Sequence, residues 1–380
     1  YFKATSYITG IFLLVIMVLW GIRLSIHADL WLGGPNGLLS LAYYSVDANG
    51  TKVGFTFETE LAPAGTTNGA ATTAANGSSA LSTFQNRQAF VSIENKDAGT
   101  VRVGRQLTVL HTIQAGYNAG GANNVVGDVA YTTAEVGATA PTNAISGLRA
   151  DSIASSPAYI LRSSNAVSYT LPTFYPGLTL AVAAAKASTD NNGTTTGNKA
   201  TSFLAKYDNG PMSVGYASAT GTIQATTAAD VATGVVAQGA FQARDTKLKN
   251  NVLGASYDLG MAKLYYTHVV LKADQELTSA FKNKVNKIGV SAPVGRFTPF
   301  VQYGTSTTTD TIGGAVGTDI NSSYKVKGTQ LGTTYDLSKR TTAYAIYGKN
   351  TGTVDAVAGT AGLGQTFSEK QYALGVRHSF

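Results

Sequence analysis

The chain has no cysteine, and charged residues make up only 13% of its 380 positions. Without cysteine it can form neither a disulfide framework nor a thiolate metal site. The charge content is low against the value of about 25% in ordinary soluble domains. The mean hydropathy of +0.03 is too polar for a bundle of membrane helices. This balance is typical of membrane barrels, whose strands alternate polar and apolar residues.

The excess of basic residues is spread along the chain. The formal net charge is +7 and the isoelectric point about 9.3. No stretch concentrates lysine, arginine and aromatic residues in the way that nucleic-acid binding requires, so we expect no nucleic-acid partner. A soluble basic protein is one interpretation of the charge. A water-filled lumen that favours anions is the sharper one.

Patterns of catalysis are also missing from the sequence. The four histidines are dispersed, and no Gly-x-Ser-x-Gly elbow is present. A covalent enzyme needs a nucleophile with an adjacent base. We therefore expect no enzyme activity, no metal site and no cofactor.

Ten consecutive apolar residues at positions 11–20 are open to three interpretations. A membrane-spanning helix needs about twenty such residues. A retained signal peptide is the second possibility. The third is the first strand of a barrel, covering residues 8–20, and strand counting favours it.

Short polar turns and long connections alternate along the rest of the chain. Turn chemistry predicts seven tight turns, at residues 47–50, 95–99, 175–177, 208–211, 258–260, 293–296 and 336–339. The long segments between them are rich in Ala, Gly, Thr, Asn and Ser, at residues 63–82, 107–161, 188–199, 220–244, 273–281, 305–323 and 351–366. An eighth long connection is expected at residues 21–36.

Seven short and eight long connections join sixteen strands. Outer-membrane barrels have an even number of strands, short periplasmic turns and longer external loops. We therefore predict a single domain over residues 1–380, an all-β, 16-stranded antiparallel transmembrane barrel. Residues 1–46 supply two atypical strands in this scheme. Two packed soluble sheets would not explain why short and long connections alternate.

Several segments have a clean period of two. In residues 372–380, Tyr372, Leu374 and Val376 share one face, and Gly375 and Arg377 share the other. In a barrel the apolar set faces lipid, the small polar set lines water, and the sheet closes so that every backbone group is paired. Tyrosines near strand ends fit the aromatic girdles of such barrels.

From about residue 53 onward the chain resembles the general porins of Gram-negative outer membranes, most closely the trimeric porins of β-proteobacteria. The segments that carry this resemblance are FQNRQAFV (84–91), GTVRVGRQ (99–106), RSSNAVSY (162–169), residues 174–180, YDLSKR (335–340) and the terminal YALGVRHSF (372–380). The ending in Phe380 resembles the signal for outer-membrane insertion. The first fifty residues do not match the family.

The resemblance implies a homotrimer of water-filled channels in the bacterial outer membrane, with both termini periplasmic. Outer-membrane lipid, lipopolysaccharide, small anions and hydrophilic solutes are then its partners. The third external loop, residues 107–161, is expected to bend inward and narrow each pore. By matching motifs, Arg105 and Arg162 are wall arginines of the constriction. The candidate loop residues opposite them are Asp128, Glu135 and Asp151.

Strict alternation complicates one of these assignments. Val101 and Val103 should face lipid, which sends Arg105 outward as well, whereas Arg102 should face the lumen. Gly104 is the position where a bulge could change the parity and bring Arg105 inside. Arg87 is expected at the rim.

The predicted function is passive diffusion of small hydrophilic solutes with a preference for anions. Guanidinium groups stay protonated and create a positive field in the neck of the channel. Two alternatives remain open, a substrate-specific channel for phosphate or an organic acid and a non-conducting structural or adhesive barrel. A saturable conductance would indicate the first, and no conductance the second.

Overall fold

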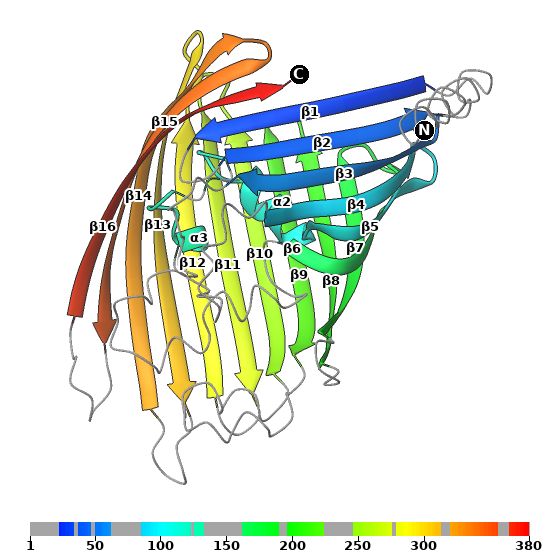
Figure 1. Cartoon of the computed structure of the whole chain (residues 1–380). Coiled ribbons are helices and arrows are strands. Elements are labelled where there is room, and N and C mark those ends of the chain that lie inside the picture. The colour runs from blue at the N-terminus through cyan, green and yellow to red at the C-terminus, as the bar shows by residue number, and fades with distance from the viewer. Residues whose placement is uncertain are drawn as a thin grey trace, which may run out of the picture.

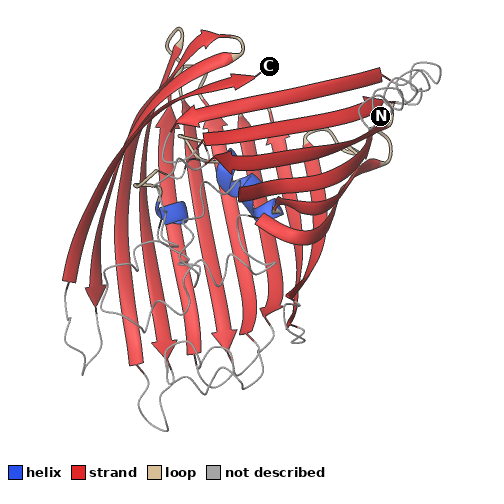
Figure 2. Ribbon diagram, viewed as in Figure 1, coloured by secondary structure: helices blue, strands red, loops and turns tan. Residues whose placement is uncertain are grey.

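A computed structural model describes residues 23–33, 37–46, 50–61, 85–121, 123, 125–132, 162–189, 196–223, 246–275, 279–312, 320–355 and 365–379. Within these ranges nearly all of the chain is β-strand, with two short helices (Figure 2). No helix in this part of the chain is long and apolar enough to cross a membrane.

The strands follow one another around a single sheet (Figure 1). They are β1 (Arg23–Gly33), β2 (Gly37–Val46), β3 (Lys52–Leu61), β4 (Gln85–Asn95), β5 (Gly99–Leu107), β6 (Arg162–Thr170), β7 (Leu178–Thr189), β8 (Thr196–Asn209), β9 (Met212–Ile223), β10 (Thr246–Asp258), β11 (Lys263–Gln275), β12 (Ser279–Ser291), β13 (Phe297–Ile312), β14 (Ile320–Ser338), β15 (Thr341–Asp355) and β16 (Gln365–Ser379).

Each strand pairs antiparallel with its neighbours in sequence, and β1 pairs with β16 to close the barrel. Asp29 lies opposite Ser379 and Gly33 opposite Gly375. Closure removes the sheet edges, so that the backbone groups of the strands can be satisfied inside the ladder. The predicted all-β antiparallel barrel is confirmed.

The prediction for the first strand is wrong. The strand that closes the barrel is β1, which lies where the sequence analysis expected a long connection, and residues 8–20 lie outside the described residues. The physical reason is visible in β1 itself. Leu24, Ile26, Leu30 and Leu32 recur at even positions, whereas the odd positions are mostly polar. This period of two predicts a half-buried strand better than an unbroken apolar run does.

Each of the seven predicted tight turns lies at a junction of two consecutive strands, although β8 extends to Asn209 and β14 to Ser338, and residues 47–49 lie outside the described residues. Gly99 shows what such a turn requires. Its φ is +85°, and a Cβ at this position would overlap the carbonyl oxygen of Thr170. Glycine adopts this conformation without steric cost.

The wall is uneven in height. Strands β1 to β6 have 9 to 11 residues and form a short wall, whereas β7 to β16 have 12 to 19 and form a long wall (Figure 1). The long strands continue into predicted loops; β13 and β14, for example, occupy most of residues 305–323. Small polar residues such as Thr and Ser can extend a ladder into water as well as form a loop.

Large apolar side chains are exposed on the outer face of the barrel at alternate positions. Representative members on the two walls are Phe55, Val91, Val103, Val167, Val182, Phe203, Val214, Leu253, Ile288, Val301, Leu331 and Leu374. Their distribution over β3 to β14 and on β16 is typical of a lipid-facing surface.

The segment after β5 contains two helices that the sequence analysis did not predict, α2 (Val109–Gly116) and α3 (Val129–Thr132). Both lie within the barrel: α2 packs against β7 to β10, and α3 against β12 to β14 (Figure 2). The third loop therefore enters the barrel with its first part, whereas residues 133–161 lie outside the described part of the chain.

Candidate functional site: the internal loop and the wall arginines

The apolar face of α2 fixes the helix to the inner wall. Thr108 caps the start of the helix, because its hydroxyl accepts a hydrogen bond from the backbone N–H of His111 at 3.1 Å. Leu110 and Ile113 have no exposed surface and pack in one cluster with wall residues that include Leu204 and Val252. Such i, i+3 spacing gives a helix one apolar side.

Tyr117, just after α2, is held by both backbone and side chain. Its ring lies so close to Gly254 that a Cβ there would overlap it. Its carbonyl oxygen accepts a hydrogen bond from the Thr267 hydroxyl at 2.7 Å, and its own hydroxyl lies 2.7 Å from the Ser213 hydroxyl. The end of α2 is therefore tied to β9, β10 and β11.

A buried ion pair anchors the start of α3 to β12. Asp128 accepts from Lys287 Nζ at 2.9 Å, and the two side chains are 0% and 4% exposed. Asn118 Nδ2 donates to the same carboxylate at 2.6 Å, and the N–H of Ala130 donates at 3.2 Å. Additional hydrogen bonds of this kind are what allow a buried pair to offset its desolvation.

A cluster of amides holds the chain between the two helices against β14 and β16. Gln330 Nε2 donates to Asn123 Oδ1 at 2.9 Å and to the carbonyl of Val125 at 2.7 Å. Gln371 Oε1 accepts from the N–H of Val126 at 2.8 Å. Side chains from the far wall therefore fix the path of the loop across the lumen.

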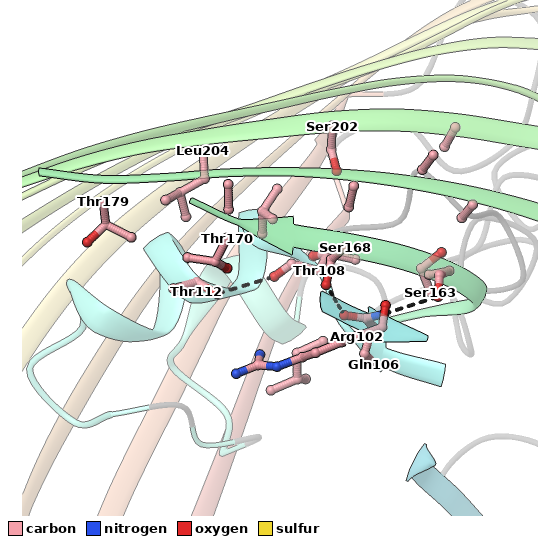
Figure 3. A pocket seen from close by; sticks show the side chains of 18 residues that line it. Arg102, Gln106, Thr108, Thr112, Ser163, Ser168, Thr170, Thr179, Ser202 and Leu204 are labelled. Atoms are coloured by element: carbon pink, nitrogen blue, oxygen red, sulfur yellow. Dashed lines mark hydrogen bonds between the residues drawn. The ribbon is translucent and has the colours of Figure 1, made fainter. Parts of the chain in front are cut away.

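Arg102 faces the interior of the barrel. It lines a cavity of about 160 Å³ between the beginning of α2 and β5 to β8, shared with Gln106, Thr108 and Leu204 (Figure 3). Its side chain is exposed, and its guanidinium carbon lies 5.5 Å from the centroid of the Phe90 ring. Gln106 is fixed beside it, because it accepts from the Ser168 hydroxyl at 2.6 Å.

The ladder beside Arg105 is irregular, as the sequence analysis expected at Gly104. The register between β5 and β6 shifts between Gly104 and Gln106. Gly104 has a φ of +132°, and Asn165, on the facing strand, has a φ of +49°. Arg105 Nη1 donates to the Ser164 hydroxyl at 2.6 Å within this irregularity.

A second irregularity brings Arg87 into the same region. The register between β3 and β4 shifts next to Glu58, and Arg87 Nε donates to Glu58 Oε1 at 2.6 Å. Both side chains are 16% exposed, and Gln88 Nε2 also donates to the carboxylate at 2.8 Å. Glu58 is therefore held in a charge-assisted hydrogen-bonded pair.

The pKa of His111 depends on the charges around the beginning of α2, a helix that is separate from the membrane-spanning strands. Burial, followed by the positive charges of Arg162 and Arg87, lowers the pKa of His111 to about 4, against a smaller opposing effect of Glu58. The imidazole is thus neutral at pH 7, next to a cluster of guanidinium groups.

Comparison with known proteins identifies the family. A family model described as Gram-negative porin matches residues 39–355, which is most of the chain. The chain belongs to the Gram-negative porins. The family consists of channel proteins of the bacterial outer membrane, so this porin is not an enzyme.

Solved structures similar to this porin share its fold. An anion-selective porin from Comamonas acidovorans has 20% identity and a TM-score of 0.60, over 94% of this chain and 100% of that one. The trimer form of OmpT from Vibrio cholerae has 11% identity and a TM-score of 0.58, over 94% and 99%. OmpF from Salmonella typhi, in complex with daunomycin, has 14% identity and a TM-score of 0.54, over 94% and 97%. No curated protein sequence gives a significant match.

The predicted site residues of this porin do not form one group. Arg102, Arg105 and Arg162 lie on adjacent strands β5 and β6, with Arg162 opposite Leu107. Asp128 does not face them; it is paired with Lys287 on β12. Glu135 and Asp151 lie outside the described residues.

Two residues of the porin's site were missed or misplaced from the sequence. Arg87 was expected at the rim but pairs with Glu58 near α2. Lys287 was missed, although its spacing puts it on the opposite face of β12 from Lys282 and Lys284.

Within the described residues, no group of three His, Asp or Glu side chains could hold a metal ion.

Proposed function

We propose that this porin is a general diffusion channel that prefers anions, and that its third loop narrows the lumen beside Arg102, Arg105 and Arg162. The observation that supports this most is that Glu58, the acid near these arginines, is bonded to Arg87. Asp128, on the loop, is bonded to Lys287 on the opposite wall. The Arg102 guanidinium lies over the Phe90 ring, and Arg105 donates to the Ser164 hydroxyl.

The electrostatics of this arrangement favour anions. Arginine remains charged at every physiological pH. Fixed charges act over about 8 Å at physiological salt, so a solute that passes between α2 and β5 stays within their field. Anions are enriched there and cations depleted, without any binding step that would saturate. The expected permeants are small hydrophilic solutes and inorganic anions.

We also propose that the working form is a homotrimer with both chain ends on the periplasmic side. The short wall supports this, because its strands are short and the outer face of β3 to β6 is apolar, which suits contact between barrels. The trimer form of the similar OmpT is consistent with it. The long connections then face the outside of the cell, where outer-membrane lipid and lipopolysaccharide surround the long wall.

Recording in a planar bilayer under a salt gradient tests the ion preference. The wild-type reversal potential should have the sign for chloride. Replacing Arg102, Arg105 and Arg162 together with alanine should move it toward zero or beyond. Arg296→Ala with Arg340→Ala is the control, because both arginines are exposed in turns.

The control should leave the potential unchanged. A triple variant with wild-type ion preference would refute the assignment of the three arginines. A conductance that saturates with one anion would indicate a substrate-specific channel instead. A folded protein without conductance would indicate a structural barrel.

A further inference from the structure

The cavity beside the start of α2 has a floor of small side chains. Ala181, Ala183 and Ala185 occupy successive inward positions of β7. In the ladder, Ala183 lies between Ser168 on β6 and Ser202 on β8. These side chains are short, so they leave about 160 Å³ open between the wall and the helix (Figure 3).

The helix α2 closes this cavity without filling it. Val109 and Thr112 line the cavity from the side of the helix. Ile113 lies instead against β9, where a Cβ on Gly215 would overlap its side chain. Because α2 is anchored to β9 and β10, its docking leaves the floor on β7 uncovered. A cavity that is already formed costs a ligand little ordering entropy.

Three hydroxyl groups in the cavity are available to a ligand. Thr170, Thr179 and Ser202 line it, and their hydroxyls form no hydrogen bond with another of the described residues. Gln106 and Ser168 differ, because the Ser168 hydroxyl already donates to Gln106 Oε1 at 2.6 Å. A hydroxyl group can both donate and accept, so the cavity offers polar contacts around its alanine floor.

Arg102 supplies positive charge at the β5 edge of the cavity. It lies opposite Ser168 in the ladder, one strand away from the floor. Its guanidinium carbon lies 5.5 Å from the centroid of the Phe90 ring. None of the ion pairs within the described part of the chain involves Arg102. The planar N–H groups of a guanidinium match the two oxygens of a carboxylate.

The size and lining of the cavity together define a class of ligand. An apolar cavity of about 150 Å³ holds benzene, so about 160 Å³ suits a single six-membered ring. Inorganic phosphate would leave the alanine floor without a contact. A cation would be repelled by Arg102. A carboxylate attached directly to a flat ring uses both the charge and the floor.

We propose that this cavity binds small aromatic carboxylates, of which benzoate is the simplest. The ring lies over Ala183 and beneath α2, and the carboxylate lies at Arg102. The proposal rests on the proposed function for the route by which such an anion reaches the cavity. Chloride has no apolar part to hold it there, so its passage still requires no binding step.

Titration calorimetry of the full chain in detergent tests the proposal, with protein-free micelles as the reference. The ligands are benzoate, acetate, which has the charge without the ring, and benzyl alcohol, which has the ring without the charge. Ala183→Leu places a larger side chain in the cavity. Val182→Leu is the matched control, because Val182 is the next residue of the same strand and is 49% exposed on the outer face.

The wild type should bind benzoate at least ~10-fold more tightly than acetate or benzyl alcohol, since a hydrogen bond to a charged group and the burial of a ring each contribute about that factor or more. Ala183→Leu should lose this preference, whereas Val182→Leu should bind benzoate as the wild type does. Equal binding of the three ligands by the wild type, or unchanged benzoate affinity in folded Ala183→Leu, overturns the proposal.

The comparison of the three ligands uses the wild type, so it stays decisive even if Ala183→Leu does not fold. Calorimetry needs no current, which separates this proposal from the proposed function. A porin that conducts anions but binds benzoate no better than acetate would refute the aromatic site and leave the channel intact. A porin that binds benzoate selectively but does not conduct would refute the channel and support the site.

Discussion

The buried pair of Lys287 and Asp128 ties the third loop to the wall. Removing one partner of a buried pair leaves an uncompensated charge, which costs roughly 3–5 kcal/mol. We therefore expect Lys287→Met to lower the apparent unfolding temperature and to release α3, which should raise single-channel conductance and its noise.

The double variant Lys287→Met with Asp128→Asn is the matched control. The amide introduced at position 128 carries no charge, and its single oxygen keeps the acceptor for the N–H of Ala130, whereas the hydrogen bond that Asn118 donates to the second carboxylate oxygen is lost. The double variant should recover most of the lost stability. If the single variant unfolds and conducts like the wild type, the pair does not hold the loop.

His111 makes the packing of α2 sensitive to acid. Its pKa is about 4 in the folded protein, below the ordinary value of about 6.5. Between these values the unfolded chain binds more protons than the folded one, so stability rises with pH. The contribution of the neutral imidazole is present above pH 6.5 and is lost progressively as the pH falls toward 4.

Thermal unfolding across this pH range measures the effect. The wild type should lose more stability between pH 6.5 and 4 than His111→Gln does, because only the wild type has the His111 imidazole. The carboxylates titrate equally in both proteins. His378→Gln, at the end of β16, is the control and should follow the wild type. Parallel curves for the wild type and His111→Gln would contradict the prediction.

Sequence reasoning at the residue scale succeeds for some wall residues and fails for the anchors of the loop. Arg102 was placed inside by alternation alone, and the irregularity at Gly104 was expected from its valine neighbours. Lys287 and Gln330 could not be assigned, because their partners on the loop are about 160 and 205 residues distant along the chain. No local sequence pattern in β12 or β14 indicates those partners.

At the scale of elements, the tight turns were predictable because glycine and asparagine chemistry fixes them locally. The ends of the long strands were not, since a Thr-rich segment serves equally as ladder or loop. The helix α2 was missed for a different reason. Its eight residues are too few for a strong period, and its stability comes from the wall cluster around Leu110 and Ile113.

The first strand shows how a strong but misleading signal can displace a weaker correct one. The apolar run at residues 11–20 drew the prediction away from β1, whose alternation is moderate and includes Arg23, His27 and Asp29. What decides between them is pairing with β2 and β16, a long-range property. The requirement for an even number of strands predicted the right kind of barrel, although the segment chosen as its first strand was wrong.

At the scale of the whole molecule, the two walls differ in height and in charge. Strands β4, β5 and β6 contain no lysine, whereas the outer face of the long wall carries pairs of directly opposed lysines, Lys249 with Lys272, Lys186 with Lys199 and Lys349 with Lys370. On the short wall, Phe55, Val91, Val103 and Val167 face one another in one row and are 48% to 54% exposed in the single chain. The long wall suits lipid and the short wall suits another barrel.

Bulky substitutions on each wall test whether that wall contacts lipid or another barrel. Val91→Trp with Val103→Trp should dissociate the assembly into monomers, because a packed interface has no room for two indole rings. Val182→Trp with Val214→Trp on the long wall is the control; lipid adapts to the larger side chains, so the trimer should persist. Native mass spectrometry in mild detergent counts the chains. A trimer in both variants, or monomers only in the control, would place the contact between barrels on a different wall.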